Sequence, residues 1–371
     1  MVASIAVSII IPVYNAQAHI AACIDSARAQ TLQPIEILCV DDGSTDQSMT
    51  LLTSLATQDN RIRVFRQPNR GAGSARNLAM SEAKGEFLSF LDADDRYASD
   101  TCLQELYAAA KRLDISICGG FRELLHPDGS ITLHSLFRRE LKRKPQGIVI
   151  PYADFQYDYH YQNFLFRRDL LEQYQISFPP YRRFQDPPFL VRAMIAAGRF
   201  AAVPIEVYLY RLSERPLDWN VEKVAGLLQG LTDDLILSRE ANLPQLHART
   251  LQRLEEEFAE AITGQLSQPE VYELCLRANA AVDVRLLPPA RAKQGEFLLL
   301  PLQLHQLQVE RGTLQSPTQA ISTRRQPIAG LIRCIREHGV GYTIRRGIEH
   351  LGIPMNAELR RPKQDKKNPH N

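Results

Sequence analysis

The stretch LDADD, Leu91–Asp95, follows directly on the apolar run FLSF at residues 87–90. Such a run predicts a buried strand, and ligands of open α/β sheets bind beyond the carboxyl ends of their strands. Asp92 and Asp94 stand one residue apart, so both carboxylates project to one side of this strand end. A second acidic pair, Asp41-Asp42, ends an earlier apolar run. Two neighbouring acidic strand ends suit a cation that holds a diphosphate.

Strands and helices alternate over the first 110 residues. Apolar runs predict strands at 6–12, 35–40, 62–65 and 86–91, and helical spacing predicts helices at 19–29 and 71–83. This βαβ alternation predicts an α/β fold with a mostly parallel sheet between helices. The opening MVASIAVSIIIPVYN lacks the basic start of a signal peptide, so we expect it to form the buried first strand.

The pattern changes after residue 117. The segment HPDG at 126–129 predicts a turn between two short strands, and further patterns predict helices at 164–173 and 185–197 and a strand at 200–210. Beyond residue 217 the chain reads as helical. We therefore expect a first domain over 1–216, a helical C-terminal extension over 217–361 and a disordered tail over 362–371.

Composition places the chain among ordinary globular proteins. It has 371 residues, of which 44% are hydrophobic and 23% charged, and no apolar run approaches the roughly 20 residues that span a bilayer. Its six cysteines have no C-x-x-C spacing, which favours a reducing cytoplasm over a zinc site or a disulfide framework. Residues 324–371 carry a net charge of +7, which leaves −5 on the rest of the chain. A basic segment of this kind predicts an anionic surface partner.

Five segments, in order between Val7 and Glu214, together resemble the inverting family-2 glycosyltransferases of bacterial surface polysaccharide synthesis. The resemblance implies a GT-A-like nucleotide-diphospho-sugar transferase fold and an enzyme of the hexosyltransferase type. It implies a UDP-sugar donor and a hydroxyl acceptor on a saccharide or lipid-linked carrier, at the cytoplasmic face of the plasma membrane. The segments are VSIIIPVYNAQAHI, EILCVDDGSTDQS, NRGAGSARNLAMSEAKGEFLSFLDADD, FQDPPFLVRAM and VYLYRLSE.

The resemblance also implies roles for the acidic strand ends. Asp94 would coordinate a divalent metal, Mn²⁺ or Mg²⁺, on the donor diphosphate, and Asp92 would contact the ribose or the metal shell. Asp42 would hydrogen-bond the nucleobase, which is chemically sensible because a carboxylate accepts from an imide N–H. The alternatives are a solvated acidic turn for the D-x-D motif and a turn or helix-cap acid for Asp42.

Three further donor-site residues follow from the same resemblance. Pro12 and Tyr14 align with positions that flank the base, with Tyr14 as a stacking platform. Arg76 would lie near the nucleotide, and a surface salt bridge is the alternative for that residue. The glycines at 71 and 73 do not form G-x-G-x-x-G, so a nicotinamide-binding fingerprint is absent.

Asp186 is the candidate catalytic base. A positioned carboxylate that draws the proton from an acceptor hydroxyl contributes about 10²–10⁴-fold to rate. In the family an Glu-Asp pair opens a helix here, whereas this chain has Gln185-Asp186 and keeps only the base. The alternative is a helix N-terminal acid stabilised by the helix dipole. Tyr208 and Arg211 match the closing Y-x-Y-R of the family, with a phosphate contact or a structural role for Arg211.

The basic amphipathic segment 328–351 predicts either contact with anionic membrane or packing on the body of the protein. Nucleic acid is not an expected partner, because the segment has few aromatics and no binding motif. Two other functions remain as alternatives. One is a non-catalytic nucleotide-sugar-binding or scaffold protein, which the altered Gln185 favours slightly. The other is a sugar-nucleotide pyrophosphorylase, whose Gly-rich N-terminal loop is replaced here by IPVYN.

Overall fold

The computed structural model describes residues 4–134, 141, 143–212 and 218–288. Within these residues the strands are β1 (Val7–Val13), β2 (Ile35–Asp41), β3 (Ile62–Arg66), β4 (Phe87–Phe90), β5 (Arg96–Tyr97), β6 (Ile117–Leu125), β7 (Ile131–His134), β8 (Ile148–Pro151), β9 (Phe164–Arg167) and β10 (Arg199–Arg211). They form one sheet in the order β3-β2-β1-β4-β9-β6-β10-β5, with β7 paired to β6 and β8 to β10.

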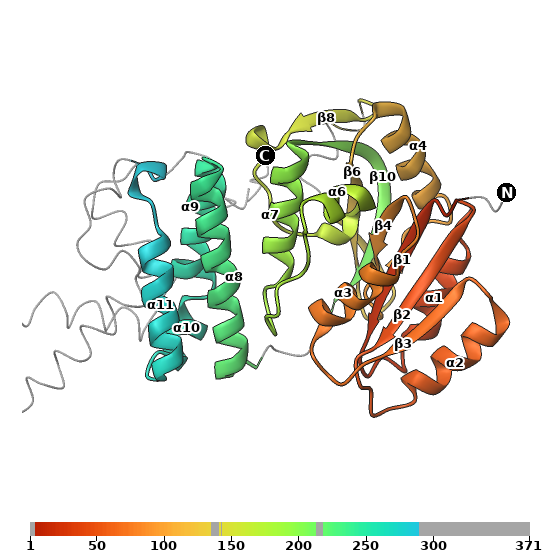
Figure 1. Ribbon diagram of the computed structural model, residues 1–371, viewed down its shortest axis with the longest axis horizontal. Helices are drawn as coiled ribbons and strands as arrows, with labels where there is room; N and C mark the ends of the chain where they lie inside the picture. Colours follow the sequence, from red (N-terminus) through yellow and green to blue (C-terminus); the bar gives the residue numbers. More distant parts are fainter. Residues whose placement is uncertain (1–3, 135–140, 142, 213–217, 289–371) are drawn as a thin grey trace, which may run out of the picture.

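Helices cover both faces of this sheet and continue beyond it (Figure 1). The α-helices are α1 (Ile20–Arg28), α2 (Ser48–Gln58), α3 (Ala72–Glu82), α4 (Cys102–Leu113), α6 (Arg168–Gln173), α7 (Asp186–Ala197), α8 (Val221–Glu240), α9 (Pro244–Gln252), α10 (Ala259–Gln265) and α11 (Pro269–Ala281). Short 3₁₀ turns lie at Tyr152–Asp154, Tyr161–Asn163 and Val284–Leu286, and a π-helical turn lies at Arg253–Glu257.

Alternation along the central strands divides the core into two layers. Ile9 and Ile11 of β1 pack with α1, α2 and α4, while Ile10 between them packs on the opposite face with α3, α6 and α7. This is the period-2 pattern of a strand buried on both sides. All seven residues of β1 are buried, which confirms the prediction that the opening segment is a core strand.

The sheet is entirely parallel in its first half and mixed in its second, where β6 and β10 also pair in parallel. Strands β1 to β4 pair in parallel, as the alternation predicts, but β9 pairs antiparallel with both β4 and β6. The prediction of one helix over 164–173 is therefore wrong for its first four residues, which form β9, and right for 168–173, which form α6. The apolar segment FLFR fits either element, and pairing with two distant strands decides for the strand.

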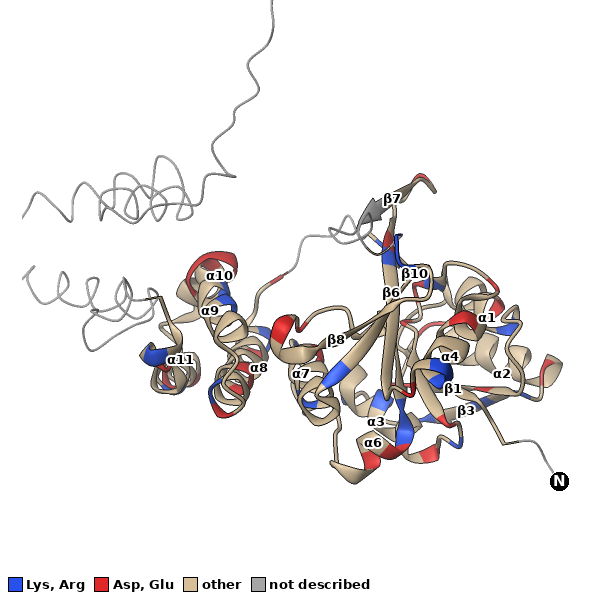
Figure 2. Cartoon of the chain, turned by 90° about the horizontal axis from the view of Figure 1, so that it is seen from above, with Lys and Arg blue, Asp and Glu red and all other residues tan. Residues whose placement is uncertain are grey.

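The helices α8 to α11 gather beside the sheet and build a core of their own. Figures 1 and 2 both place α7 between these helices and the sheet. The boundary expected at 216 falls within 213–217, outside the described residues. The basic segment 328–351 and the tail 362–371 also lie outside them. Among the described residues, no helix has the length and apolarity needed to cross a membrane.

One buried acid stands out in the helical core. Asp234 of α8 is fully buried, and neither of its carboxylate oxygens has a hydrogen-bond partner within the described chain. Burial, followed by the charge of Asp158, raises the pKa of Asp234 well above its usual value. The folded protein thus binds a proton at Asp234 more tightly than the unfolded chain does. Its contribution to stability is present at low pH and is lost as pH rises above the ordinary aspartate pKa of about 4.

We expect Asp234→Leu to stabilise the protein, because leucine fills a similar volume without a charge to bury. The gain in the free energy of unfolding should be about 1 kcal/mol or more at pH 8 and smaller at pH 5, as measured by urea denaturation. Glu240→Leu, at the exposed end of the same helix, is the control and should show no such pH-dependent gain. An equal effect of Asp234→Leu at both pH values would contradict the raised pKa of Asp234 in the folded protein.

Candidate active site

The site lies where β1 and β4 separate. The β1–β2 ladder runs to the pair Val13–Asp41, whereas the β1–β4 ladder stops at Ile10–Phe90. The chain continues from β1 to β2 on one side and returns to β4 on the other, which is the switch point where open sheets bind ligands. Pro12 lies just past the last β4 pair on that side, so its missing N–H removes no ladder hydrogen bond.

The LDADD turn emerges from β4 into this crevice, and β10 holds it in place. The Tyr208 hydroxyl donates to Asp95 Oδ2 at 2.7 Å and accepts from the Asp92 backbone N–H at 3.1 Å. The Arg211 backbone N–H donates to Asp95 Oδ1 at 2.6 Å, and its Nε donates to the Asp94 carbonyl at 3.0 Å. Tyr208 and Arg211 therefore have structural contacts here. Asp95 is the buried anchor of the turn, and Asp94 is exposed.

The three carboxyl groups of the turn repel one another. Burial and the charges of Asp92 and Asp94 raise the pKa of Asp95 to about 8. Burial of its inner side and the charge of Asp92 also raise the pKa of Asp94. The part of both shifts that comes from neighbouring carboxylates would be relieved by a cation near the turn.

The exposed Asp94 carboxylate fits a divalent metal. No side chain of the described residues donates a hydrogen bond to it, and an oxygen ligand suits Mg²⁺ or Mn²⁺. The described residues contain no group of three or more His, Cys, Asp or Glu arranged to hold a metal. A cation at Asp94 would thus take its other ligands from phosphate and water, as Mg²⁺ commonly does.

Arg76 joins the acidic turn to the candidate base. Its Nη2 donates to Asp92 Oδ1 at 2.6 Å, and its Nη1 donates to Asp186 Oδ1 at 3.2 Å. The guanidinium lies 5.2 Å from the ring centres of Tyr161 and Phe178. Only 4% of Arg76 is exposed, so the guanidinium is buried and not on the surface as the predicted alternative required, although its two carboxylate partners are partly exposed. Burial opposes the charge, but Tyr161 and the two carboxylates together raise the pKa of Arg76.

Asp186 begins α7 with its carboxylate toward Arg76. Its side chain is 37% exposed and thus reachable from solvent. Burial of the carboxylate raises the pKa of Asp186. The charge of Arg76 lowers this pKa, and the charge of Asp92 raises it further. A raised pKa makes a carboxylate a stronger base. Gln185, which replaces the expected Glu, is buried, and a Cβ on Gly73 would lie 3.2 Å from its Cγ.

The predicted nucleobase end is built by β1 and β2. Tyr14 is 51% exposed at the end of β1, as a stacking platform requires. Asp42 is buried and already accepts three hydrogen bonds, from Gln67 Nε2 at 2.7 Å and from the backbone N–H groups of Arg70 and Gly71 at 2.8 Å each. Its carboxylate thereby fastens the loop that leads into α3, and its contact with a base stays a prediction.

Two residues of the site were not predicted from sequence. Gln162 donates from Nε2 to Asp92 Oδ2 at 3.1 Å, and the ring of Tyr161 lies against Arg76. Both come from the segment YADFQYDYHYQNFLF, residues 152–166. Only its density of aromatic residues distinguishes this segment from an ordinary loop. That density does not predict which residues Tyr161 and Gln162 contact.

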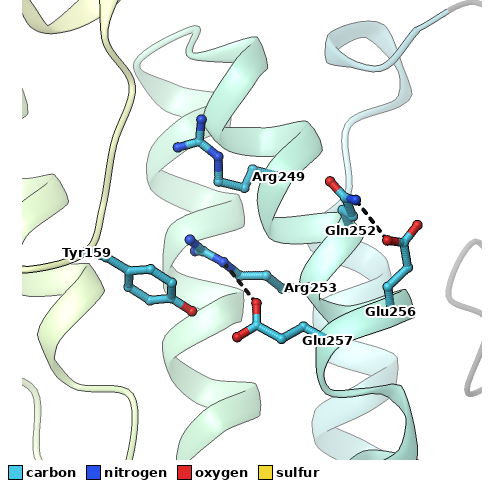
Figure 3. Close-up of a pocket in the computed structure, with 6 residues that line it drawn as sticks. All are labelled: Tyr159, Arg249, Gln252, Arg253, Glu256 and Glu257. Atoms are coloured by element: carbon cyan, nitrogen blue, oxygen red, sulfur yellow. Dashed lines mark hydrogen bonds and ion pairs between the residues drawn. The ribbon is translucent and has the colours of Figure 1, made fainter. Parts of the chain in front are cut away.

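A separate pocket of about 480 Å³ lies in the helical part (Figure 3). Within it Arg253 pairs with Glu257 and Gln252 donates to Glu256, while Arg253 also binds the buried Asp158. Its polar groups largely satisfy one another, and none belongs to the acidic turn. The lining residues are Tyr159, Arg249, Gln252, Arg253, Glu256 and Glu257.

Comparison with known sequences finds one family. The model described as Glycosyl transferase family 2 matches residues 8–175. EpsH and EpsJ of Bacillus subtilis, both named as glycosyltransferases, are each 34% identical to this chain over 212 and 209 residues. These matches cover 56% and 55% of this chain but only 61% and 60% of the two relatives. Glycosyltransferase GlyG of Streptococcus pneumoniae is 26% identical over 304 residues, 75% of this chain and 96% of GlyG.

Comparison of folds agrees. The crystal structure of S. aureus TarS 1–349 in complex with UDP-GlcNAc aligns with a TM-score of 0.63 at 19% identity. The alignment covers 94% of this chain and 92% of that one. At this identity the likeness concerns the fold alone, and it confirms the GT-A-like class expected from sequence.

We expect Arg76→Gln to destabilise the protein by about 3 kcal/mol, because it leaves two carboxylates without their shared cation. Arg76→Lys keeps the charge but cannot reach both acids in the same way, so it should also destabilise, by less. Urea denaturation measures both. The control Arg285→Gln removes an 83% exposed partner of Asp283 and should leave the free energy of unfolding nearly unchanged. Equal losses at positions 76 and 285 would contradict the bridging role.

Proposed function

We propose that this chain, whose residues 8–175 match the model of glycosyl transferase family 2, is an inverting glycosyltransferase. The proposed reaction moves a sugar from a nucleotide-diphosphate sugar, a UDP-sugar, to a hydroxyl of a saccharide or lipid-linked acceptor in surface polysaccharide synthesis. The observation that carries the proposal is the buried Arg76, which holds Asp92 of the acidic turn and Asp186 of α7 at one crevice.

The donor would lie across the switch point. Tyr14 would stack on the base, and Asp42, next to it in the fold, would accept from the base at the expense of one of its loop hydrogen bonds. Asp92 would contact the ribose. Asp94 would hold a divalent cation, whose charge offsets the negative charge that develops on the leaving diphosphate.

Asp186 would act on the acceptor. Its carboxylate takes the proton of the acceptor hydroxyl while the hydroxyl oxygen forms a bond to the anomeric carbon. The bond from that carbon to the diphosphate breaks on the opposite face, so the configuration inverts. Arg76 fixes the orientation of Asp186 through one carboxylate oxygen and leaves the other oxygen for the proton. A lipid-linked acceptor would suit the basic segment 328–351, which lies outside the described residues.

We expect UDP to bind in the presence of Mn²⁺ and to bind at least roughly tenfold more weakly to Asp94→Ala, a loss of about 1.4 kcal/mol. Removal of the carboxylate takes away the only protein ligand assigned to the cation. Calorimetry with UDP, GDP, CDP and TDP, with and without Mn²⁺, measures this. Asp128→Ala, in the exposed turn between β6 and β7, is the matched control and should bind as the wild type does. Absence of binding for every nucleotide would remove the donor site from the proposal.

We expect Asp186→Asn to lower kcat by about 10²–10⁴-fold, because the amide cannot accept the proton. The readout is UDP release from UDP-N-acetylglucosamine, used as a probe with saccharide acceptors or water, beside UDP affinity by calorimetry. UDP affinity should stay near that of the wild type. Asp169→Asn, an acid in the first turn of α6, controls for the helix-dipole alternative and should retain activity. Nucleotide binding without turnover in the wild type would favour the scaffold function instead.

A further inference from the structure

The segment between Phe178 and Asp186 carries the candidate base, and α3 fastens its beginning. Asn77 exchanges two hydrogen bonds with Phe178: its Nδ2 donates to the Phe178 carbonyl at 2.8 Å, and its Oδ1 accepts from the backbone N–H at 2.9 Å. Arg182 Nη1 donates to Asn69 Oδ1 at 2.6 Å. One side of the segment therefore rests on the sheet domain.

Helix α8 presses on the other side through two glycines. A Cβ added to Gly230 would lie 2.3 Å from the Phe184 carbonyl oxygen, and one added to Gly226 would lie 3.0 Å from the backbone N and O of Arg183. The two glycines are four residues apart and so face the same direction on the helix. At position 230 only glycine permits this approach of one backbone to another, and at position 226 a larger residue would require the facing backbone to shift slightly. The contact ends two residues before Asp186.

Phe184 itself has an unusual backbone. Its φ of +65° lies in the left-handed region, which a bulky residue adopts only where its surroundings enforce it. The surroundings are those of the helical part: Phe184 belongs to the core of α8 to α11, with its ring 5.7 Å from that of Phe258. The turn that leads into Asp186 is thus shaped by helices that follow it in the chain.

Polar contacts from α8 reach both sides of the base. Arg182 Nε pairs with Glu222 at 2.9 Å, and the Tyr181 hydroxyl donates to Asp233 Oδ2 at 3.2 Å. Asp233 also pairs with Arg192 of α7 at 2.8 Å. One helix therefore holds the segment before Asp186 and the helix after it.

We propose that Gly226 and Gly230 of α8 are positioning residues for Asp186 in the transfer reaction, so that the helical part takes part in catalysis through the base. The inference rests on the proposed function. A methyl group at position 230 forces Phe184 back by about 1 Å to reach ordinary contact, and misplacement of a catalytic group by that distance costs about 10²-fold in rate. The donor residues Tyr14, Asp42 and Asp94 lie on other elements and keep their places.

Three Gly→Ala variants form a graded test. Gly230→Ala should lower kcat in the UDP-release assay about 100-fold, and Gly226→Ala should lower it less, with the donor KM and the affinity for UDP unchanged in both. Gly264→Ala in α10 is the matched control, because an added Cβ there meets nothing within 4 Å. Amide hydrogen exchange should become faster across 181–186 in Gly230→Ala and stay unchanged across 91–95. Wild-type exchange in 181–186, or wild-type kcat in both variants, overturns the inference.

The outcomes separate this inference from the function on which it rests. If Asp186→Asn keeps full activity, the base assignment fails, whatever the glycine variants do. If Asp186→Asn is inactive and the glycine variants are not, only the positioning role fails. A parallel fall in kcat and in UDP affinity would show general disruption and also contradict the role. Should Gly230→Ala not fold, Gly226→Ala with its milder 3.0 Å contact decides the same question.

Discussion

A single buried guanidinium organises the site. Arg76 brings together two carboxylates that lie 94 positions apart in the chain, and its ion pairs exist only because β4, α3 and α7 all end or begin at the same crevice. A buried charge is costly unless paired with good geometry. Here two acids and the faces of Tyr161 and Phe178 surround it. Those rings belong to a larger aromatic cluster, in which Phe178 stacks on Phe189 of α7 at 4.0 Å. The aromatic packing beneath the site therefore also holds α7, the helix that begins with the candidate base Asp186.

The sheet prepares the place for this arrangement. Parallel strands β1, β2 and β4 direct their carboxyl ends to one edge, and the early end of the β1–β4 ladder opens it. Strand β10 then reaches across from the mixed half of the sheet and fixes the acidic turn through Tyr208 and Arg211. The turn keeps one carboxylate inside, at Asp95, and one exposed, at Asp94. The carboxylates of the turn repel one another, and the hydrogen bonds from Tyr208 and Arg211 of β10 hold the turn in place against this repulsion.

Local patterns were sufficient for the parallel half. Its strands and helices follow from periodicity and turn residues within single segments, and the acidic motifs were found because they end such strands. The mixed half was not predictable in this way, because FLFR at 164–167 becomes a strand only through pairing with β4 and β6. Asp186 and Arg76 were both named from sequence, but their ion pair was not predicted, since the two residues meet across 110 positions of the chain. Gln162 carries no local signal. From sequence alone, the glycines of α8 are only destabilising residues within a helix; their contact with the facing backbone is seen only in the structure.

Helix α3 joins the two ends of the site within one rigid element. The loop before it is tied to Asp42 through the N–H groups of Arg70 and Gly71, and its second turn presents Arg76 to Asp186. Substitutions at Asp42 and at Asp186 therefore act on the same helix at neighbouring places, the loop before it and its second turn, although the residues are far apart in sequence. Effects of mutations that share a structural element do not simply add. If Asp42 recognises the base and Asp186 serves the acceptor, as proposed, the evolutionary consequence is epistasis: a change in base recognition alters which changes near the acceptor the protein tolerates, so donor and acceptor specificity would not drift independently.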